Sequence, residues 1–252
     1  MILKKWIKAG ILACGIAASL IGAASADTLD KVKQAGVIVI ANGGAFPPFG
    51  YVENGKMVGF DIDLGNEIAR RLGVKPQWEK IDFSGLLPAL SSMRVDMLLT
   101  AMTWTPERAQ RISFSTPYYN SGIAGAFRPG TKIAGPADLA GKVVAVQIGS
   151  AGERFVRELG TAKEIKTYND FMLAFSDVEA GRADVVVNTL PVVKYNAVRR
   201  SSKLAVSDTW DKRSVGANTR LEDKKLLEAV NVIIADLQRE GFLATLDAKW
   251  FK

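Results

Sequence analysis

Residues 100 to 122 read T-A-M-T-W-T-P-E-R-A-Q-R-I-S-F-S-T-P-Y-Y-N-S-G, with a helix start in the middle of the run. Thr105 is predicted to be the N-cap and Pro106 the first helical residue, because threonine and proline are favoured at these positions. Arg108 then falls at the third helical position, where a capping box would carry Glu or Gln and the helix dipole disfavours a cation. This position indicates that Arg108 has a partner outside its own helix.

Two kinds of partner are open for Arg108. One is an anion, held by the guanidinium together with the hydroxyl and amide of Thr103. The other is an ordinary salt bridge, which is the commoner role of an arginine. The motifs elsewhere in the chain favour the anion.

Several motifs occur in a fixed order along the chain. They are G-F-D-I-D-L at 59 to 64, D-F-S-G-L-L-P-A-L at 82 to 90, T-P-E-R-A-Q-R-I-S-F-S at 105 to 115 and P-Y-Y at 117 to 119. With them, the chain from about Leu29 onward resembles the periplasmic solute-binding proteins for polar amino acids that serve ABC importers, known as family 3 of the extracellular solute-binding proteins. The resemblance implies an α/β periplasmic-binding-protein fold of type II, with two lobes, a mostly parallel sheet and crossover helices in each, and two hinge crossings. It also implies capture of an amino acid or related small carboxylate by lobe closure, and delivery to an inner-membrane ABC permease.

The first 26 residues have the features of a cleavable signal peptide. Lysines at positions 4, 5 and 8 precede a short apolar run, and Ala24-Ser25-Ala26 ends it. The run is shorter than the ~20 residues of a membrane span. We therefore expect cleavage after Ala26 and a periplasmic protein, in preference to lipidation at Cys14.

The composition of the remaining 226 residues excludes several classes of function. They contain no histidine and no cysteine, which excludes the Ser-His and Cys-His triads and the usual zinc sites. Their 30 basic and 26 acidic residues leave too small a net charge to indicate nucleic-acid binding. We expect no metal, no cofactor and no catalytic residues, and a monomer whose stability comes from packed cores.

Strand-like and helix-like segments alternate in two separate series, which predicts two α/β lobes. The small, extended run from Gly122 to Phe127 suits one crossing between the lobes, and residues 208 to 216 contain the other. We therefore predict lobe 1 at 27–124 plus 214–252 and lobe 2 at 125–213.

Two phenylalanines are predicted to contact the ligand from lobe 1. Phe46 lies in a loop with two glycines and two prolines after a short apolar strand, and Phe83 starts a helix. In the resembling family, the residue matching Phe46 lies over the ligand and the one matching Phe83 stacks on its far side. From local sequence alone, core packing of Phe46 and a hydrophobic staple at Phe83 remain alternatives.

An aspartate opens the amphipathic helix that is predicted to end at Gly73. Because the helix dipole favours a carboxylate at this position, we interpret Asp61 as a structural cap and not as a catalytic acid.

Lobe 2 offers a helix N-terminus after a turn at Gly149, with Ser150 and Ala151 next to it. Unpaired backbone N–H groups at such a helix start point toward an anion. Any tight strand-to-helix turn can use glycine, so the pattern is weak by itself. The resemblance implies that the ligand carboxylate lies here, and Ala151, at the position of the family's second Thr or Ser, offers only its backbone amide.

One position departs from the family pattern. In D-x-x-V-x-D-x-P-V the second Asp binds the ligand's α-ammonium, and with Asp184 and Pro191 fixing the register, Thr189 stands in its place. A hydroxyl accepts one hydrogen bond but does not neutralise an ammonium. Asn188 is neutral and is expected on the opposite strand face.

Three explanations of Thr189 remain open. Another carboxylate acts from elsewhere, or the ligand has an absent, substituted or weakly recognised α-amino group, or an ordinary amino acid binds with lower affinity. The predicted ligand-binding residues are Phe46, Phe83, Thr100, Ala101, Met102, Thr103, Arg108, Gly149, Ser150, Ala151 and Thr189.

A different class of function on the same fold is the alternative, a cyclohexadienyl-dehydratase-like enzyme. Its chemistry needs a proton donor from lobe 2 in the cleft. The segment from Val185 to Val193 contains no Asp or Glu, so we expect a binding protein.

Overall fold

The computed structural model describes residues 27–199 and 204–251. The signal-peptide prediction and Cys14 lie outside the described residues. Among the described residues, no helix has the length and apolar character needed to cross a bilayer.

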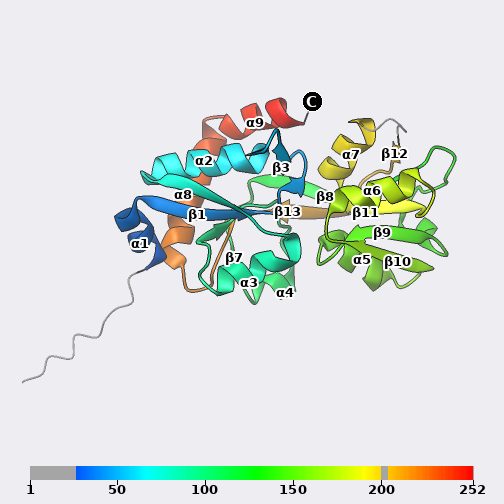
Figure 1. The fold of residues 1–252 in the computed structure, drawn as a ribbon, viewed down its shortest axis with the longest axis horizontal. Helices are drawn as coiled ribbons and strands as arrows, with labels where there is room; N and C mark the ends of the chain where they lie inside the picture. The colour runs from blue at the N-terminus through cyan, green and yellow to red at the C-terminus, as the bar shows by residue number, and fades with distance from the viewer. Residues whose placement is uncertain (1–26, 200–203, 252) are drawn as a thin grey trace, which may run out of the picture.

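The chain forms an α/β structure with two lobes, which lie side by side in Figure 1. The helices are α1 (Thr28–Ala35), α2 (Phe60–Leu72), α3 (Leu86–Ser91), α4 (Pro106–Ala109), α5 (Ala151–Leu159), α6 (Phe171–Glu179), α7 (Leu190–Arg199), α8 (Lys224–Arg239) and α9 (Phe242–Trp250), with 3-10 turns at Phe83–Gly85 and Pro136–Leu139. The strands are β1 (Val37–Asn42), β2 (Ala45–Phe46), β3 (Gly50–Glu53), β4 (Lys56–Val58), β5 (Lys75–Lys80), β6 (Met97–Leu98), β7 (Ser113–Phe114), β8 (Tyr119–Phe127), β9 (Val143–Gln147), β10 (Glu164–Tyr168), β11 (Val185–Thr189), β12 (Ala205–Val206), β13 (Asp211–Val215) and β14 (Asn218–Thr219).

Each lobe is built on a sheet with a parallel and an antiparallel part. The lobe 1 sheet has the order β5-β1-β6-β14-β7, in which β5, β1 and β6 are parallel and β14 pairs antiparallel with both neighbours. In lobe 2 the order is β10-β9-β11-β8-β12, in which β10, β9 and β11 are parallel and β8 runs antiparallel. The parallel strands are those predicted from the strand and helix alternation, and they carry the crossover helices.

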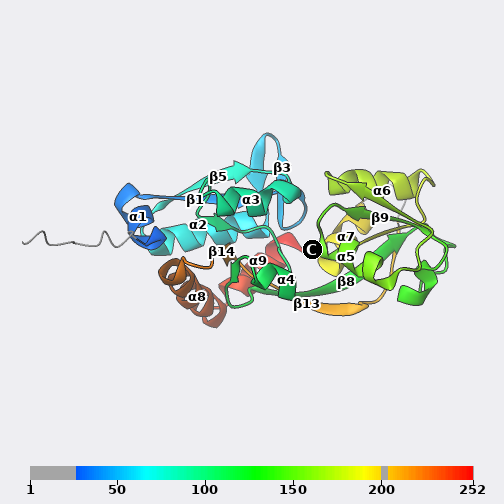
Figure 2. The ribbon, with the colours of Figure 1, turned by 90° about the horizontal axis from the view of Figure 1, so that it is seen from below.

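Two paired strands connect the lobes. β8 and β13 run antiparallel, in register from Tyr119 opposite Val215 to Ile123 opposite Asp211. Figure 2 shows both strands passing from one lobe to the other. The lobe boundaries near residues 124 and 213 stay a prediction.

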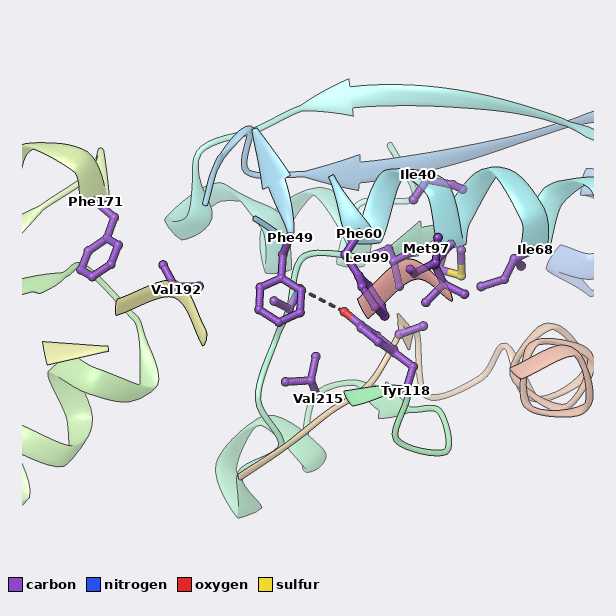
Figure 3. Packing of buried hydrophobic residues seen from close by; sticks show 14 of the residues in the cluster. Ile40, Phe49, Phe60, Ile68, Met97, Leu99, Tyr118, Phe171, Val192 and Val215 are labelled. Atoms are coloured by element: carbon purple, nitrogen blue, oxygen red, sulfur yellow. Dashed lines mark hydrogen bonds between the residues drawn. The ribbon is translucent and has the colours of Figure 1, made fainter. Parts of the chain in front are cut away.

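The lobe 1 core lies between its sheet and α2, α8 and α9. Tyr118 stacks on Phe60 with ring centroids 6.0 Å apart, and Figure 3 shows both beside Leu99. Phe171 and Val192 belong to lobe 2 and lie well apart from this group in the same view. Phe60, Phe171 and Val192 nevertheless belong to one continuous cluster of buried residues, so apolar packing extends from one lobe to the other.

The interpretation of Asp61 as a helix cap was wrong. The α2 N-cap is Gly59, without a side-chain cap, and Gly73 ends the helix in the left-handed conformation as predicted. Asp61 is fully buried, and its Oδ1 accepts a hydrogen bond from the Tyr118 hydroxyl at 2.8 Å. Its carboxylate therefore joins α2 to the segment before β8.

Candidate functional site

The Arg108 helix start forms as its sequence predicts. Thr105 is the N-cap of α4, its hydroxyl accepts the N–H of Arg108 at 3.3 Å, and Pro106 follows it. The side chain of Arg108 turns back along the preceding segment, so that Nη1 donates to the carbonyl oxygen of Thr103 at 2.8 Å and to its Oγ1 at 3.0 Å. Thr103 is thus the predicted neighbour, and it holds the guanidinium in place.

The guanidinium of Arg108 also reaches across to lobe 2. Its Nη2 donates to the carbonyl oxygen of Gly149 at 2.9 Å, in the turn between β9 and α5. The side chain is only 6 % exposed, and its hydrogen-bond acceptors are all neutral. A buried cation without a carboxylate partner is costly in a stable fold, and it attracts an anion.

The electrostatic surroundings of Arg108 agree with this. Burial is the largest cause of a lowered pKa of Arg108, and together with the positive charges of Arg154 and Arg213 it brings that pKa to about 10. The neighbouring carboxylate of Glu107 opposes the shift and forms its own ion pair with Arg154 across the lobes. At neutral pH Arg108 therefore carries its charge and faces two further cations.

The helix start in lobe 2 is capped by its own side chains. Ser150 is the N-cap of α5, and its hydroxyl accepts the N–H of Glu153 at 3.1 Å. The N–H of Gly149 donates to Oε2 of Glu153 at 2.6 Å. The turn therefore presents the Gly149 carbonyl to Arg108, and the remaining first-turn amides of α5 begin at Ala151.

A small cavity of about 10 Å³ lies between these elements, and we call it the arginine cavity. It is lined by Phe46, Phe83, Ala101, Thr103, Arg108, Gln147, Ser150, Ala151, Asn188 and Thr189. An adjoining cavity of about 60 Å³ shares Phe46, Phe83 and Gln147 with it. The adjoining cavity is completed by Gly43, Ala45, Lys80, Asp82, Thr100, Asn169 and Asp170.

Most of the predicted site residues meet at these two cavities. Eight of the eleven border the arginine cavity, and Thr100 borders the adjoining one. Gly149 contributes through its carbonyl group. Met102 is 1 % exposed and packs in the core cluster with Leu86, Leu98 and Ile112, and it borders neither cavity.

The two phenylalanines that were predicted to contact the ligand pack against different side chains. Phe46 packs on Phe171 of α6 with ring centroids 5.8 Å apart, which is a contact between lobes. The guanidinium carbon of Arg108 lies 5.6 Å from the ring centroid of Phe83, a cation–π distance. Both rings border the two cavities, and their stacking on a ligand stays a prediction.

The backbone at Ala101 has an uncommon conformation. Its φ is 49°, in the left-handed region that few residues other than glycine adopt. Its N–H donates to the Tyr118 hydroxyl at 3.2 Å, so the Asp61–Tyr118 pair holds this turn. Unusual backbone held in place by buried contacts is often found at binding sites.

Two lining residues of the arginine cavity were not predicted. Gln147 ends β9 and Asn188 precedes the last residue of β11, and the ends of neighbouring parallel strands are where α/β proteins bind ligands. That positional signal was available in the sequence for both. Asn188 was expected on the strand face opposite Thr189, and both residues border the arginine cavity.

Among residues 27–199 and 204–251, no group of three His, Cys, Asp or Glu side chains is able to hold a metal ion. The polar chemistry at the cavity is that of one guanidinium, three hydroxyls and two amides. Such a set binds a small anion through charge-assisted hydrogen bonds.

Comparison with known proteins places this chain in a family. The model of the bacterial extracellular solute-binding proteins, family 3, matches residues 38–252, and the chain belongs to that family. The "L-cystine-binding protein TcyJ" of Escherichia coli is 30% identical over 248 residues, which cover 96% of this chain and 93% of that protein. The predicted family and fold class are thereby confirmed.

Two solved structures are similar over most of the chain. Holo ArgBP from T. maritima has a TM-score of 0.79 and 35% sequence identity, covering 88% of this chain and 99% of that one. The ancestral amino acid-binding protein AncCDT-1, a precursor of cyclohexadienyl dehydratase, has a TM-score of 0.84 and 33% identity, covering 90% and 100%. The chain is thus of the same type as the solute-binding components of ABC importers. The relatives named here are binding proteins.

Proposed function

We propose that this protein captures an amino acid or a related small carboxylate between its two lobes, in the periplasm, and delivers it to an inner-membrane ABC permease. The observation that carries the proposal is the buried guanidinium of Arg108, which has only neutral hydrogen-bond partners and borders a cavity between the lobes. A ligand carboxylate supplies the missing negative charge. The relatives named for cystine and for amino acids support a ligand of this size.

Ligand entry requires the lobes to separate. The arginine cavity of about 10 Å³ has room for roughly one water molecule, far below the ~300 Å³ or more of ordinary ligand pockets. Contacts between the lobes close it, including the bond from Asn196 Nδ2 to the Pro47 carbonyl at 3.2 Å. The strand pair β8 and β13 is the connection about which closure takes place. A permease that recognises the closed shape then recognises the loaded protein.

We expect no catalysis at this site, and a monomer that needs no cofactor. Within residues 27–199 and 204–251, no Asp or Glu lines the arginine cavity, so no carboxylic acid from this part of the chain borders it to protonate a leaving group. The periplasmic location rests on the predicted signal peptide at residues 1–26 and on the family.

A thermal-shift screen tests the proposal. The purified protein is heated with each of a panel of amino acids, 2-oxo acids and dicarboxylates. A ligand at a hundredfold excess over its Kd adds about 2.7 kcal/mol to the free energy of unfolding and raises the Tm by several degrees. If no carboxylate in the panel shifts the Tm while uncharged solutes do, the proposed anion site is wrong.

A further inference from the structure

Two polar side-chain atoms at the end of β11 are buried without a hydrogen-bond partner. They are Nδ2 of Asn188 and Oγ1 of Thr189. The two residues are 2 % and 3 % exposed, and both border the arginine cavity. Buried polar atoms are nearly always hydrogen-bonded, so an unpaired pair beside a ligand cavity indicates what the ligand must offer.

The orientation of the Asn188 amide is fixed by the backbone. Its Oδ1 accepts the N–H of Thr189 at 2.9 Å. A flipped amide would place its NH₂ group against that N–H, donor against donor. The unpaired end of Asn188 is therefore a hydrogen-bond donor, and it requires an acceptor.

The charge of the cavity leads to the same requirement. Among the residues that the structure describes, Arg108 is the only charged one that lines the cavity, and none with a carboxylate borders it. Asp82 and Asp170 border only the adjoining cavity, where Lys80 accompanies them. An ammonium group beside Arg108 would thus meet a guanidinium and the donor of Asn188, and the side-chain acceptors that line the cavity, the hydroxyl of Thr189 among them, are neutral.

Resting on the proposed function, we infer that the ligand is a carboxylate with an oxygen acceptor on the carbon next to the carboxyl group, a 2-oxo or 2-hydroxy acid, and not a free α-amino acid. The carboxylate binds Arg108. A 2-oxo oxygen accepts from Asn188 Nδ2 and from the Thr189 hydroxyl, and a 2-hydroxyl accepts from the first and donates to the second. Either group satisfies both unpaired atoms.

Matched triplets of acids test this inference by calorimetry on the purified protein. The probes are glutamate, 2-hydroxyglutarate and 2-oxoglutarate, the leucine, phenylalanine and alanine series built in the same way, and succinate as an acid without a 2-substituent. Within the triplet that binds best, the 2-oxo or 2-hydroxy acid should bind at least tenfold more tightly than the amino acid. Equal or tighter binding of the amino acid, or of succinate, overturns the inference and leaves the proposed function in place. Failure of every probe overturns both.

Substitutions at Thr189 supply a second test, which does not require the best ligand to be known. Thr189→Val keeps the shape and removes the hydroxyl, and should weaken the 2-oxo acid more than the amino acid. Thr189→Asp should shift the preference toward the amino acid by tenfold or more. Thr167→Asp, at an exposed threonine on β10, is the matched control and should leave the preference unchanged. An unchanged preference in a folded Thr189→Asp variant, with a circular dichroism melt like that of the unmutated protein, contradicts the inference.

Discussion

Nη2 of Arg108 lies 2.9 Å from the carbonyl oxygen of Gly149, and this hydrogen bond joins residues 41 positions apart on opposite sides of the arginine cavity. The carbonyl is a neutral acceptor, so the contact positions the guanidinium without neutralising it. The guanidinium of Arg108 and the turn at Gly149 in lobe 2 are therefore held together by a hydrogen bond that forms only when the lobes meet.

The first prediction concerns the charge of Arg108. Arg108→Ala should abolish or strongly weaken binding of the best carboxylate in the panel, because truncating one member of a buried charge pair costs roughly 2–5 kcal/mol, a factor of about 30 or more in Kd. Calorimetry measures the affinity, and a thermal melt checks the fold. Arg111→Ala, at an exposed arginine three residues on, is the matched control. Near-normal affinity in Arg108→Ala would rule out the carboxylate assignment.

The second prediction concerns closure. Small-angle X-ray scattering should give a smaller radius of gyration with the ligand than without it, because the ligand joins the two lobe surfaces and binds the closed form preferentially. The same compound added to Arg108→Ala should leave the radius as it was. A radius that stays constant at saturation in the unmutated protein argues against a closing clamp.

The third prediction concerns the aromatic wall. Phe83→Ala should weaken the binding of every carboxylate by a similar factor without changing which carboxylates compete, since the ring contacts Arg108 and we expect it to contact the ligand body but not the 2-substituent. Competition calorimetry measures the order of affinities. Phe155→Ala, on α5 and stacked on Trp210 away from both cavities, is the control for loss of a ring. A changed order of competing carboxylates would mean that Phe83 takes part in selectivity.

The fourth prediction concerns pH and Asp61. Burial raises the pKa of Asp61 to about 7, while the hydrogen bond from Tyr118 opposes the shift. A carboxyl whose folded pKa is raised contributes stability that is complete below its unfolded pKa and is lost as the pH rises through the folded value. The free energy of unfolding should therefore fall between pH 5 and pH 7, by at most about 1.4 kcal/mol per pH unit.

Denaturant unfolding at a series of pH values measures this effect. Asp61→Asn keeps an oxygen for the Tyr118 hydroxyl and removes the titration, so its curve should be flatter over the same range. The chain contains no histidine, so no imidazole titrates in that window. Parallel curves for the two proteins would show that Asp61 is ionised throughout.

Much of the local structure follows from the sequence. The cap at Thr105, the helix start at Pro106 and the end of α2 at Gly73 form as predicted, because each depends on a side chain or a φ angle within a few residues. The parallel strands followed from length, β-branched residues and alternation with helices. Strands β7 and β14 are two residues long and too short to show a period, so the antiparallel part of the lobe 1 sheet was not predicted.

Some features of the candidate site also follow from the sequence, and others do not. The sequence by itself determined that a cation occupies the first turn of α4 and that a threonine occupies the position after Asn188. Both depend only on where a residue stands relative to its neighbours along the chain. Only the tertiary structure decided that Arg108 meets the Gly149 carbonyl, that Asn188 borders the cavity, and that Asp61 bonds Tyr118 57 residues away instead of capping its helix. These contacts join segments far apart in sequence, and their geometry is set by the packing of sheets and helices that no local pattern encodes.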